Sequence, residues 1–436
     1  MANGTTVRIK PDSMALDERT YAKVTWRLLP LLFLCYIVAY LDRVNVGFAK
    51  LQMLSDLQFS ETVYGLGAGI FFIGYFFFEV PSNLILHRVG ARRWIARIMI
   101  TWGLISSAMM FVTTPTMFYV MRFLLGIAEA GFFPGIILYL TYWYPSHRRG
   151  RITSLFMTAV PLAGVIGSPI SGWIMERLSG VHGWAGWQWL FLLEGLPSVL
   201  VGLLVLVYLE DDIKTAKWLT DAEKTYLAGQ IRDDKAPECN HSLGDAMRDP
   251  KVWILSLVYF GVVMGLYGIG FWLPTLVKAT GVKSALDIGL LSAIPYAVAT
   301  VAMVLVGRSA DARRERRWHF AIPCVLGAVG LLMSAAYASS TQLALMSLTL
   351  ACAGIITALP LFWSFPTAIL TGTAAAGGIA WINSLGNLAG FVSPYMVGYV
   401  KDLTQSTNAG MYALATSLLV SALLVLLCIP ARLVNR

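Results

Sequence analysis

The chain has 436 residues, of which 57% are hydrophobic and only 13% are charged, and its formal net charge is +9. A soluble domain carries about twice that charged fraction, so the composition excludes an ordinary soluble protein. The mean hydropathy of +0.67 indicates an integral membrane protein.

Apolar runs of about 20 residues, long enough to cross a hydrocarbon core as helices, recur along the whole chain. We place twelve spans at residues 28–48, 62–86, 94–112, 117–143, 152–175, 188–209, 252–277, 288–307, 319–338, 342–369, 376–399 and 411–430. The first run is too long for the core of a signal peptide and continues into charged residues. We therefore expect it to remain as the first transmembrane helix.

Lys and Arg gather on one side of this twelve-span arrangement, in the connections 88–97, 148–151 and 308–317, the central polar segment and the two ends of the chain. Such a bias marks the cytoplasmic side. It predicts a multi-pass protein of the inner (plasma) membrane with both termini in the cytoplasm. It also accounts for the positive charge without nucleic acid as a partner.

A polar segment at 210–251 divides the chain into an N-terminal half (1–209) and a C-terminal half (252–436), and its stretch LTDAEKTYLAGQI predicts a short surface helix. The two halves share a weak repeat, because LHRVGARRW and VGRSADARRERRW end at Trp94 and Trp318, 224 positions apart. We therefore expect an all-α fold of twelve transmembrane helices in two six-helix halves, a recurring design of transporters whose binding site lies between the halves.

Six ionisable side chains fall inside predicted spans, all in the first half: Asp42, Arg43, Glu79, Arg122, Glu129 and Glu194. A charge at the centre of a membrane helix costs about 2.5–3.5 kcal/mol, so these groups must pair with one another or line a water-filled cavity. Asp42 and Arg43 are neighbours and diverge by about 100° around a helix, so we do not expect them to be each other's only partner. Arg122 and Glu129 are seven positions apart and share a face.

Two interpretations of Asp42 and Arg43 remain open: they mark the membrane surface, or they belong to a buried site. In a buried site, the four carboxylates and two guanidiniums give a net charge of −2, so at least one acid has reason to hold a proton. An arriving organic anion adds negative charge, so anion binding and protonation favour each other. The planar guanidiniums of Arg43 and Arg122 suit a substrate carboxylate.

The second half has no ionisable residue deep in a span and can contribute only hydroxyl groups, amides and rings. We single out Tyr267, Trp363 and Asn383 as substrate-binding candidates, although ordinary packing or an interfacial position also accounts for the aromatic residues. For Glu79 a gating or helix-packing role is favoured over proton transfer. For Glu194 a structural hydrogen bond is an equal alternative.

Several motifs resemble the anion:cation symporter branch of the major facilitator superfamily: YLDRVNVGFA (40–49), EVPSNL (79–84), GARRW (90–94), RFLLGIAEAGFFPG (122–135) and GWQWLFLLEGLP (186–197). The resemblance implies proton-coupled uptake of an organic anion such as tartrate, a sugar acid or an aromatic carboxylate.

By the same resemblance, Arg43 binds the substrate carboxylate, Asp42 and Glu129 couple protons, Arg122 pairs with Glu129, and Asn383 lines the site. The superfamily's loop motif would place an aspartate where this chain has His87, whereas the second copy keeps Asp311. We expect gating or structural roles for Arg88 and Asp311.

A second hypothesis is an organic-anion exchanger, favoured by the glycines of GVIGSPISG (164–172), although small residues also let helices approach closely. A membrane enzyme or receptor is disfavoured, because the chain offers no metal-ligand spacing and no nucleotide-binding loop. We expect no catalytic residue, no bound metal or cofactor, the proton gradient as driving force, and a functional monomer. The five cysteines are expected to be small apolar core residues.

Overall fold

The computed structural model describes residues 11–234, 248–370 and 373–435, and its regular elements are helices throughout these residues. The first half contains α1 (Pro11–Val44), α2 (Val46–Leu57), α3 (Glu61–Val89), α4 (Ala91–Ala108), α5 (Pro115–Glu129), α6 (Phe132–Thr141), α7 (Ser146–Met157), α8 (Ala159–Arg177) and α9 (Gly186–Tyr208), with short 3-10 turns at Met109–Phe111 and Val181–Gly183. The second half contains α12 (Pro250–Ala279), α13 (Ala285–Arg313), α14 (Arg317–Ala336), α15 (Thr341–Phe362), α16 (Ser364–Ile369), α17 (Thr373–Thr404), α18 (Asn408–Cys428) and α19 (Ala431–Val434).

Eleven helical stretches within the described residues are long and apolar enough to cross a membrane. They coincide with eleven of the twelve predicted spans. The remaining span, 376–399, lies within the 32-residue helix α17. Large apolar side chains such as Leu200, Val207 and Leu427 are exposed on the outer faces of the bundle, as a surface in contact with lipid requires.

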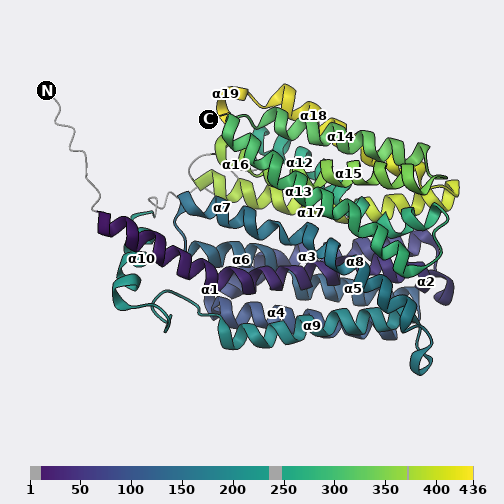
Figure 1. The fold of residues 1–436 in the computed structure, drawn as a ribbon, viewed down its shortest axis with the longest axis horizontal. Coiled ribbons are helices and arrows are strands. Elements are labelled where there is room, and N and C mark those ends of the chain that lie inside the picture. Colours follow the sequence, from purple (N-terminus) through teal and green to yellow (C-terminus); the bar gives the residue numbers. More distant parts are fainter. Residues whose placement is uncertain (1–10, 235–247, 371–372, 436) are drawn as a thin grey trace.

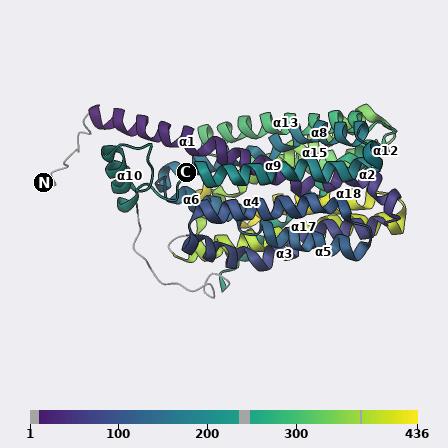
Figure 2. The same cartoon turned by 90° about the horizontal axis from the view of Figure 1, so that it is seen from below.

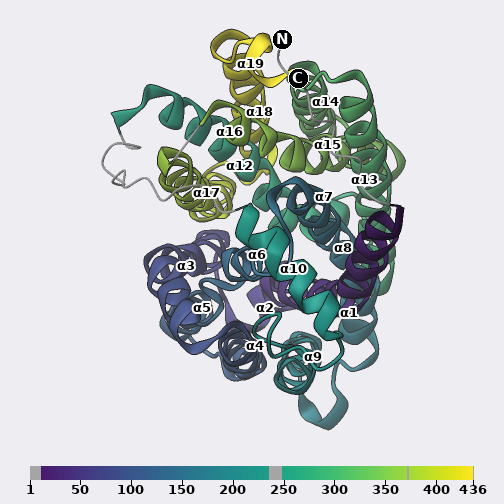
Figure 3. The ribbon, with the colours of Figure 1, turned by 90° about the vertical axis from the view of Figure 1, so that its left-hand side faces the viewer.

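The helices run roughly parallel to the long axis of the molecule, and the short helix α10 (Asp221–Asp233) sits at one end (Figures 1 and 2). We call this end the α10 end. The opposite end, at the loops 58–60, 178–185, 280–284 and 405–407, is the distal end. Seen from the α10 end, the helices of the two halves form two groups, with α3 beside α17 and α8 beside α13 (Figure 3).

The predicted surface helix of the central segment is confirmed as α10. Its N-terminus carries a capping box, in which Thr220 accepts from the Glu223 amide and Glu223 accepts from the Thr220 amide. Contacts from this segment reach the first half, through the Lys23–Glu223 and Arg149–Asp234 ion pairs.

Several predicted single spans are broken into two helices. The break between α1 and α2 is a local irregularity at Asn45, whose backbone stays right-handed helical (φ −57°, ψ −27°), whereas the break between α5 and α6 is at Ala130–Gly131, where Gly131 has a φ of +83°. The two positions lie within two residues after an intramembrane charge, Arg43 and Glu129 respectively. Helices interrupted at the level of the binding site recur among membrane transporters.

The glycines of the fifth span serve close helix packing. A Cβ at Gly164 would clash with the Tyr296 ring, and one at Gly172 would lie 2.4 Å from the carbonyl oxygen of Ala285. Cys35, Cys324 and Cys352 are buried as predicted. Cys428, however, is exposed, because it ends α18 on an outward face, and Cys239 lies outside the described residues.

Candidate functional site

Arg43 lies in the last turn of α1, with only 7% of its surface exposed. Its guanidinium forms an ion pair with Glu129, the last residue of α5, and donates a 2.9 Å hydrogen bond to the Tyr267 hydroxyl of α12. The rings of Phe71 and Tyr75 lie 5.5 and 5.6 Å from its Cζ. One side chain therefore joins a carboxylate of the first half to a hydroxyl of the second.

Arg122 is completely buried but does not pair with Glu129. Its Nε and one terminal nitrogen donate to the carbonyl oxygens of Gly67 and Ala68 in α3, both at 3.3 Å, and its other terminal nitrogen has no partner. The expected Arg122–Glu129 pair is thus replaced by Arg43–Glu129. The break at Asn45 and the break at Ala130–Gly131 end α1 and α5 at the level where these two side chains meet.

Asp42 faces away from Arg43, as the chain geometry predicts, and is 1% exposed. Its carboxylate accepts hydrogen bonds from the Trp102 ring nitrogen (2.7 Å), the Ser106 hydroxyl (2.7 Å) and the Ser198 hydroxyl (2.5 Å). A serine hydroxyl donates to a carboxylate but also accepts from a carboxylic acid. The pocket on α4 and α9 therefore suits both protonation states of Asp42.

The burial of Asp42 and Arg43 excludes the interpretation that they merely mark the membrane surface. Both side chains are buried, and each bonds to residues of other helices. The prediction that they are not each other's only partner is confirmed, since Asp42 and Arg43 bond to different residues.

Glu79 and Asn383 form a second polar contact between the halves. The Asn383 amide of α17 donates a 2.7 Å hydrogen bond to one carboxylate oxygen of Glu79 in α3, and the other oxygen has no partner. Asn383, the predicted polar residue of the second half, is therefore bonded to a neighbouring helix.

The aromatic candidate Trp363 packs its ring against that of Tyr259, with 4.9 Å between the ring centroids.

Glu194 is buried in α9, where one oxygen accepts from the Ser171 hydroxyl at 2.6 Å and the other has no hydrogen-bond partner. The Asn45 side chain lies beside it, also buried and without a hydrogen bond of normal geometry. No sequence pattern pointed to a role for Asn45. Its position at the break between α1 and α2 is what brings it to Glu194.

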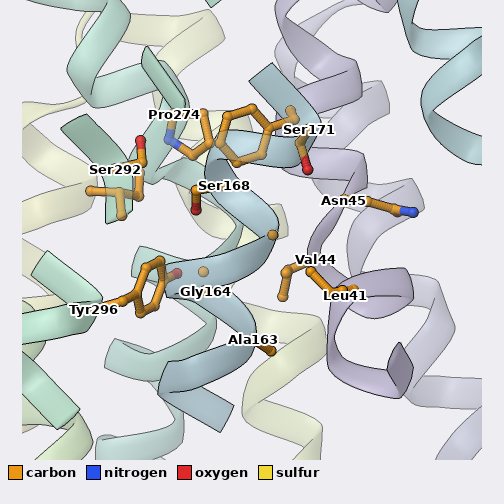
Figure 4. Close-up of a pocket in the computed structure, with 14 residues that line it drawn as sticks. Leu41, Val44, Asn45, Ala163, Gly164, Ser168, Ser171, Pro274, Ser292 and Tyr296 are labelled. Carbon is orange, nitrogen blue, oxygen red and sulfur yellow. The ribbon is translucent and has the colours of Figure 1, made fainter. Parts of the chain in front are cut away.

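A narrow cavity of about 20 Å³, with room for little more than a water molecule, lies between α8, α12, α13 and the end of α1. Figure 4 shows Tyr296 and Ser292 of α13 opposite Gly164 and Ser168 of α8, whereas the Asn45 amide points away from Tyr296 and Ser292. The six intramembrane charges are not among the residues that line this cavity.

Lys50 of α2 lies just beyond the predicted first span (28–48), yet only 4% of it is exposed. Its ammonium group pairs with Glu61 at 2.6 Å and lies 3.4 Å from the centre of the Trp272 ring, a cation–π contact. Glu61 also pairs with Lys401 of the second half at 2.5 Å. The only hint in the sequence was the run of apolar residues on both sides of Lys50.

At the α10 end, Arg88 and Asp311 are exposed, and Asp311 lies 3.6 Å from the Arg316 guanidinium. His87 is exposed as well. The carboxylate of Asp211, in the central segment, accepts a hydrogen bond from the Arg92 amide at 2.8 Å. It therefore caps the N-terminus of α4 in the first half.

The model of the Major Facilitator Superfamily matches residues 32–394. A protein of Pseudomonas putida named "Putative metabolite transport protein NicT" is 50% identical over the full length of both chains. A "Putative tartrate transporter" of Agrobacterium vitis is 51% identical and covers 94% of this chain and 92% of its own.

Among solved structures, a bacterial homolog of the human lysosomal transporter Spinster, in an inward-facing and occupied conformation, superposes with a TM-score of 0.75. It is 16% identical and covers 94% of this chain and 97% of its own, so it supports the fold. The family model and the relatives make the protein a transporter and not an enzyme. The chain belongs to the Major Facilitator Superfamily.

Proposed function

We propose that this transporter takes up a small organic anion together with protons, by alternating access to a site at Arg43. The observation that carries the proposal is that buried Arg43 is shared between Glu129 of the first half and Tyr267 of the second. A guanidinium is the side chain best suited to a carboxylate. In the substrate-free protein, Glu129 forms an ion pair with that guanidinium.

Substrate binding and protonation are linked through this pair. When a substrate carboxylate binds the Arg43 guanidinium, Glu129 loses its counterion. An unpaired charge at a buried position costs several kcal/mol. Glu129 then favours its protonated form. By linkage, protonation of Glu129 frees Arg43 for the anion.

Asp42 is the second proton site in this proposal. The Ser106 and Ser198 hydroxyls next to it serve as donors to the carboxylate or as acceptors from the acid. Asp42 has no ion-pair partner within the described residues, so a proton is its only neutralising partner there. Tyr267, Asn383 and Trp363 then contribute to substrate binding from the second half, and Arg122 positions α5 against α3.

The relatives support a hydroxylated carboxylate such as tartrate as substrate, because two relatives that are 51% identical carry the name of tartrate transporter. The distribution of Lys and Arg supports an inner-membrane protein with both termini in the cytoplasm. The distal end is then the outer end. No cofactor is needed, and the proton gradient drives uptake by a monomer.

The test is uptake of labelled tartrate, sugar acids and aromatic carboxylates into proteoliposomes under an imposed pH gradient, by the wild type and by Glu129→Gln. We expect the wild type to accumulate substrate and the variant to lose accumulation, because glutamine cannot bind a proton. The variant should keep exchange of internal for external substrate.

Accumulation by Glu129→Gln equal to the wild type would contradict the role of Glu129. Wild-type uptake that needs substrate inside the vesicles and ignores the pH gradient would instead favour the exchanger.

A further inference from the structure

At the distal end, two carboxylates each accept hydrogen bonds from the opposite half of the molecule. Asp402, near the end of α17, accepts from the backbone amides of Glu61 (3.2 Å) and Thr62 (2.7 Å) and from the Thr62 hydroxyl (2.5 Å) at the start of α3. A carboxylate of the second half thus caps the N-terminus of a helix of the first half.

The second carboxylate is Glu176, near the end of α8. It accepts from the Ser284 hydroxyl (2.5 Å) and from the Leu286 amide (3.0 Å) at the start of α13. Ser284 is the N-cap of α13, as Ser60 is the N-cap of α3. A carboxylate at a helix N-terminus satisfies free amides and is favoured by the helix dipole.

The two contacts are copies of one another under the internal repeat. Ser60 and Ser284 are 224 positions apart, as are Thr62 and Leu286, and the two carboxylates at 176 and 402 are 226 apart. The same contact has therefore been built twice, with the roles of the two halves exchanged.

Backbone packing at the distal end follows the same symmetry. A Cβ at Gly65 would lie 2.4 Å from the Pro394 carbonyl oxygen, and one at Gly289, 224 positions later, 2.3 Å from the Ser168 carbonyl oxygen. Likewise, a Cβ at Gly172 would lie 2.4 Å from the Ala285 carbonyl oxygen, and one at Gly398 would lie 2.3 Å from the Glu61 carbonyl oxygen. Helices of opposite halves are in direct backbone contact here.

We propose that Glu176 and Asp402 are the positioning residues that hold the distal end closed, as two equivalent latches between the halves. Opening this end requires α3 to leave α17 and α13 to leave α8, so each helix N-terminus loses its carboxylate. The latches therefore set the fraction of molecules whose site is reachable from the distal side.

One asymmetry sharpens the expectation. Beside the Asp402 latch, Lys401 pairs with Glu61 across the halves, whereas the position equivalent to Glu61 in the second half is Ala285. The α3–α17 contact keeps an ion pair when Asp402 is neutralised. Loss of Glu176 should therefore open the distal end more than loss of Asp402.

The experiment measures the distance between spin labels at Thr113→Cys and Ser339→Cys, in distal loops of opposite halves, with Cys239 and Cys428 replaced by serine. Pulsed electron resonance on the substrate-free full chain gives the populations of the closed (short) and open (long) forms. We expect Asp402→Asn and Glu176→Gln each to lower the closed-to-open ratio about two- to fivefold. Because the latches share no residue, the double variant should show about the product.

The matched control is Asp287→Asn, which removes an exposed carboxylate from the first turn of α13 in its own half and should leave the distances unchanged. Restoring the charge with Asp402→Glu should recover the wild-type ratio in part. If Asp402→Asn does not elute as a folded monomer, Thr62→Val removes a single latch hydrogen bond and should shift the ratio in the same direction.

An unchanged distance distribution in the double variant, or an equal shift in Asp287→Asn, would overturn the proposal. The inference rests on the proposed alternating access of the two halves, but its readout needs neither substrate nor protons. A failure of the Glu129→Gln uptake test would therefore leave this result standing, and the reverse also holds.

Discussion

Arg43 is the residue at which the chemistry of the site converges. One nitrogen pairs with a carboxylate and another donates to a hydroxyl from the opposite half, so its fork geometry is used in full. A lysine has the same charge but offers one compact ammonium group. It cannot hold Glu129 and Tyr267 in the same arrangement.

We therefore expect Arg43→Lys to weaken substrate binding and raise the apparent KM of uptake about tenfold or more, since hydrogen bonds to charged groups are worth about 1.5–3 kcal/mol. Concentration-dependent uptake in proteoliposomes measures this constant. Arg93→Lys, at an exposed position of the α10 end, is the matched control and should behave as the wild type. An unaltered constant in Arg43→Lys would argue against Arg43 as the carboxylate-binding residue.

The residues of the site were predictable from the sequence, but their partners were not. A charge inside an apolar run is visible in the sequence and costly in lipid, which singles out Asp42, Arg43 and Glu129. The choice between Arg43 and Arg122 as the partner of Glu129 depends on how α1, α3 and α5 pack. Sequence spacing within one helix carries no information on that choice.

At the scale of elements, the helix breaks position the charges. Gly131 begins α6 with a left-handed backbone (φ +83°), and a Cβ there would lie 2.4 Å from the Ser82 hydroxyl oxygen. That hydroxyl accepts a hydrogen bond from the Trp94 ring nitrogen. Apolar residues continue through the break, so the sequence pattern predicts one uninterrupted span here.

Gly131→Ala should lower the free energy of unfolding by about 2–4 kcal/mol, of which about 1–2 kcal/mol is backbone strain and the rest is steric overlap. The midpoint of thermal unfolding in detergent measures the change. Gly180 has a similar φ of +85° and no atoms within 4 Å of a built Cβ, so Gly180→Ala should show the strain alone. Equal midpoints for the two variants would contradict the role of the Ser82 contact.

At the scale of the whole molecule, the weak internal repeat in the sequence predicts two halves of six spans. It did not reveal the contacts between α3 and α17 or between α8 and α13, because these join different parts of the repeat. Those contacts depend on the relative orientation of the halves. A transporter that alternates its access changes that orientation during each cycle.

The central segment braces only the first half in the contacts that we describe. Asp17 of α1 accepts from Tyr226 of α10 at 2.8 Å and from Arg148 of α7 at 2.5 Å. At the C-terminal end of α10, Asp234 accepts from the Ser146 amide at 2.8 Å and the Ser146 hydroxyl at 2.5 Å. The brace ties α10 to α1 and α7 as one unit.

Asp234 makes this brace sensitive to acid. Burial alone would raise the pKa of Asp234, but the hydrogen bonds from Ser146 and the charge of Arg149 outweigh it and hold the pKa below its usual value. A carboxyl with a lowered pKa in the folded state stabilises that state above the pKa of the unfolded chain, about 3.9. The contribution is lost as the pH falls through the folded pKa.

Asp234→Asn should therefore increase hydrogen exchange of the α10 amides at pH 7 by about two- to fivefold, the range of an exposed ion pair. The difference from the wild type should vanish once the pH falls below the lowered pKa of Asp234 in the folded protein, after correction for intrinsic exchange. Asp221→Asn, at the exposed start of the same helix, tests for a general effect of charge on α10 and should lack this pH dependence. A difference between Asp234→Asn and the wild type that persists unchanged at low pH would show that the brace depends on the shape of the side chain and not on its charge.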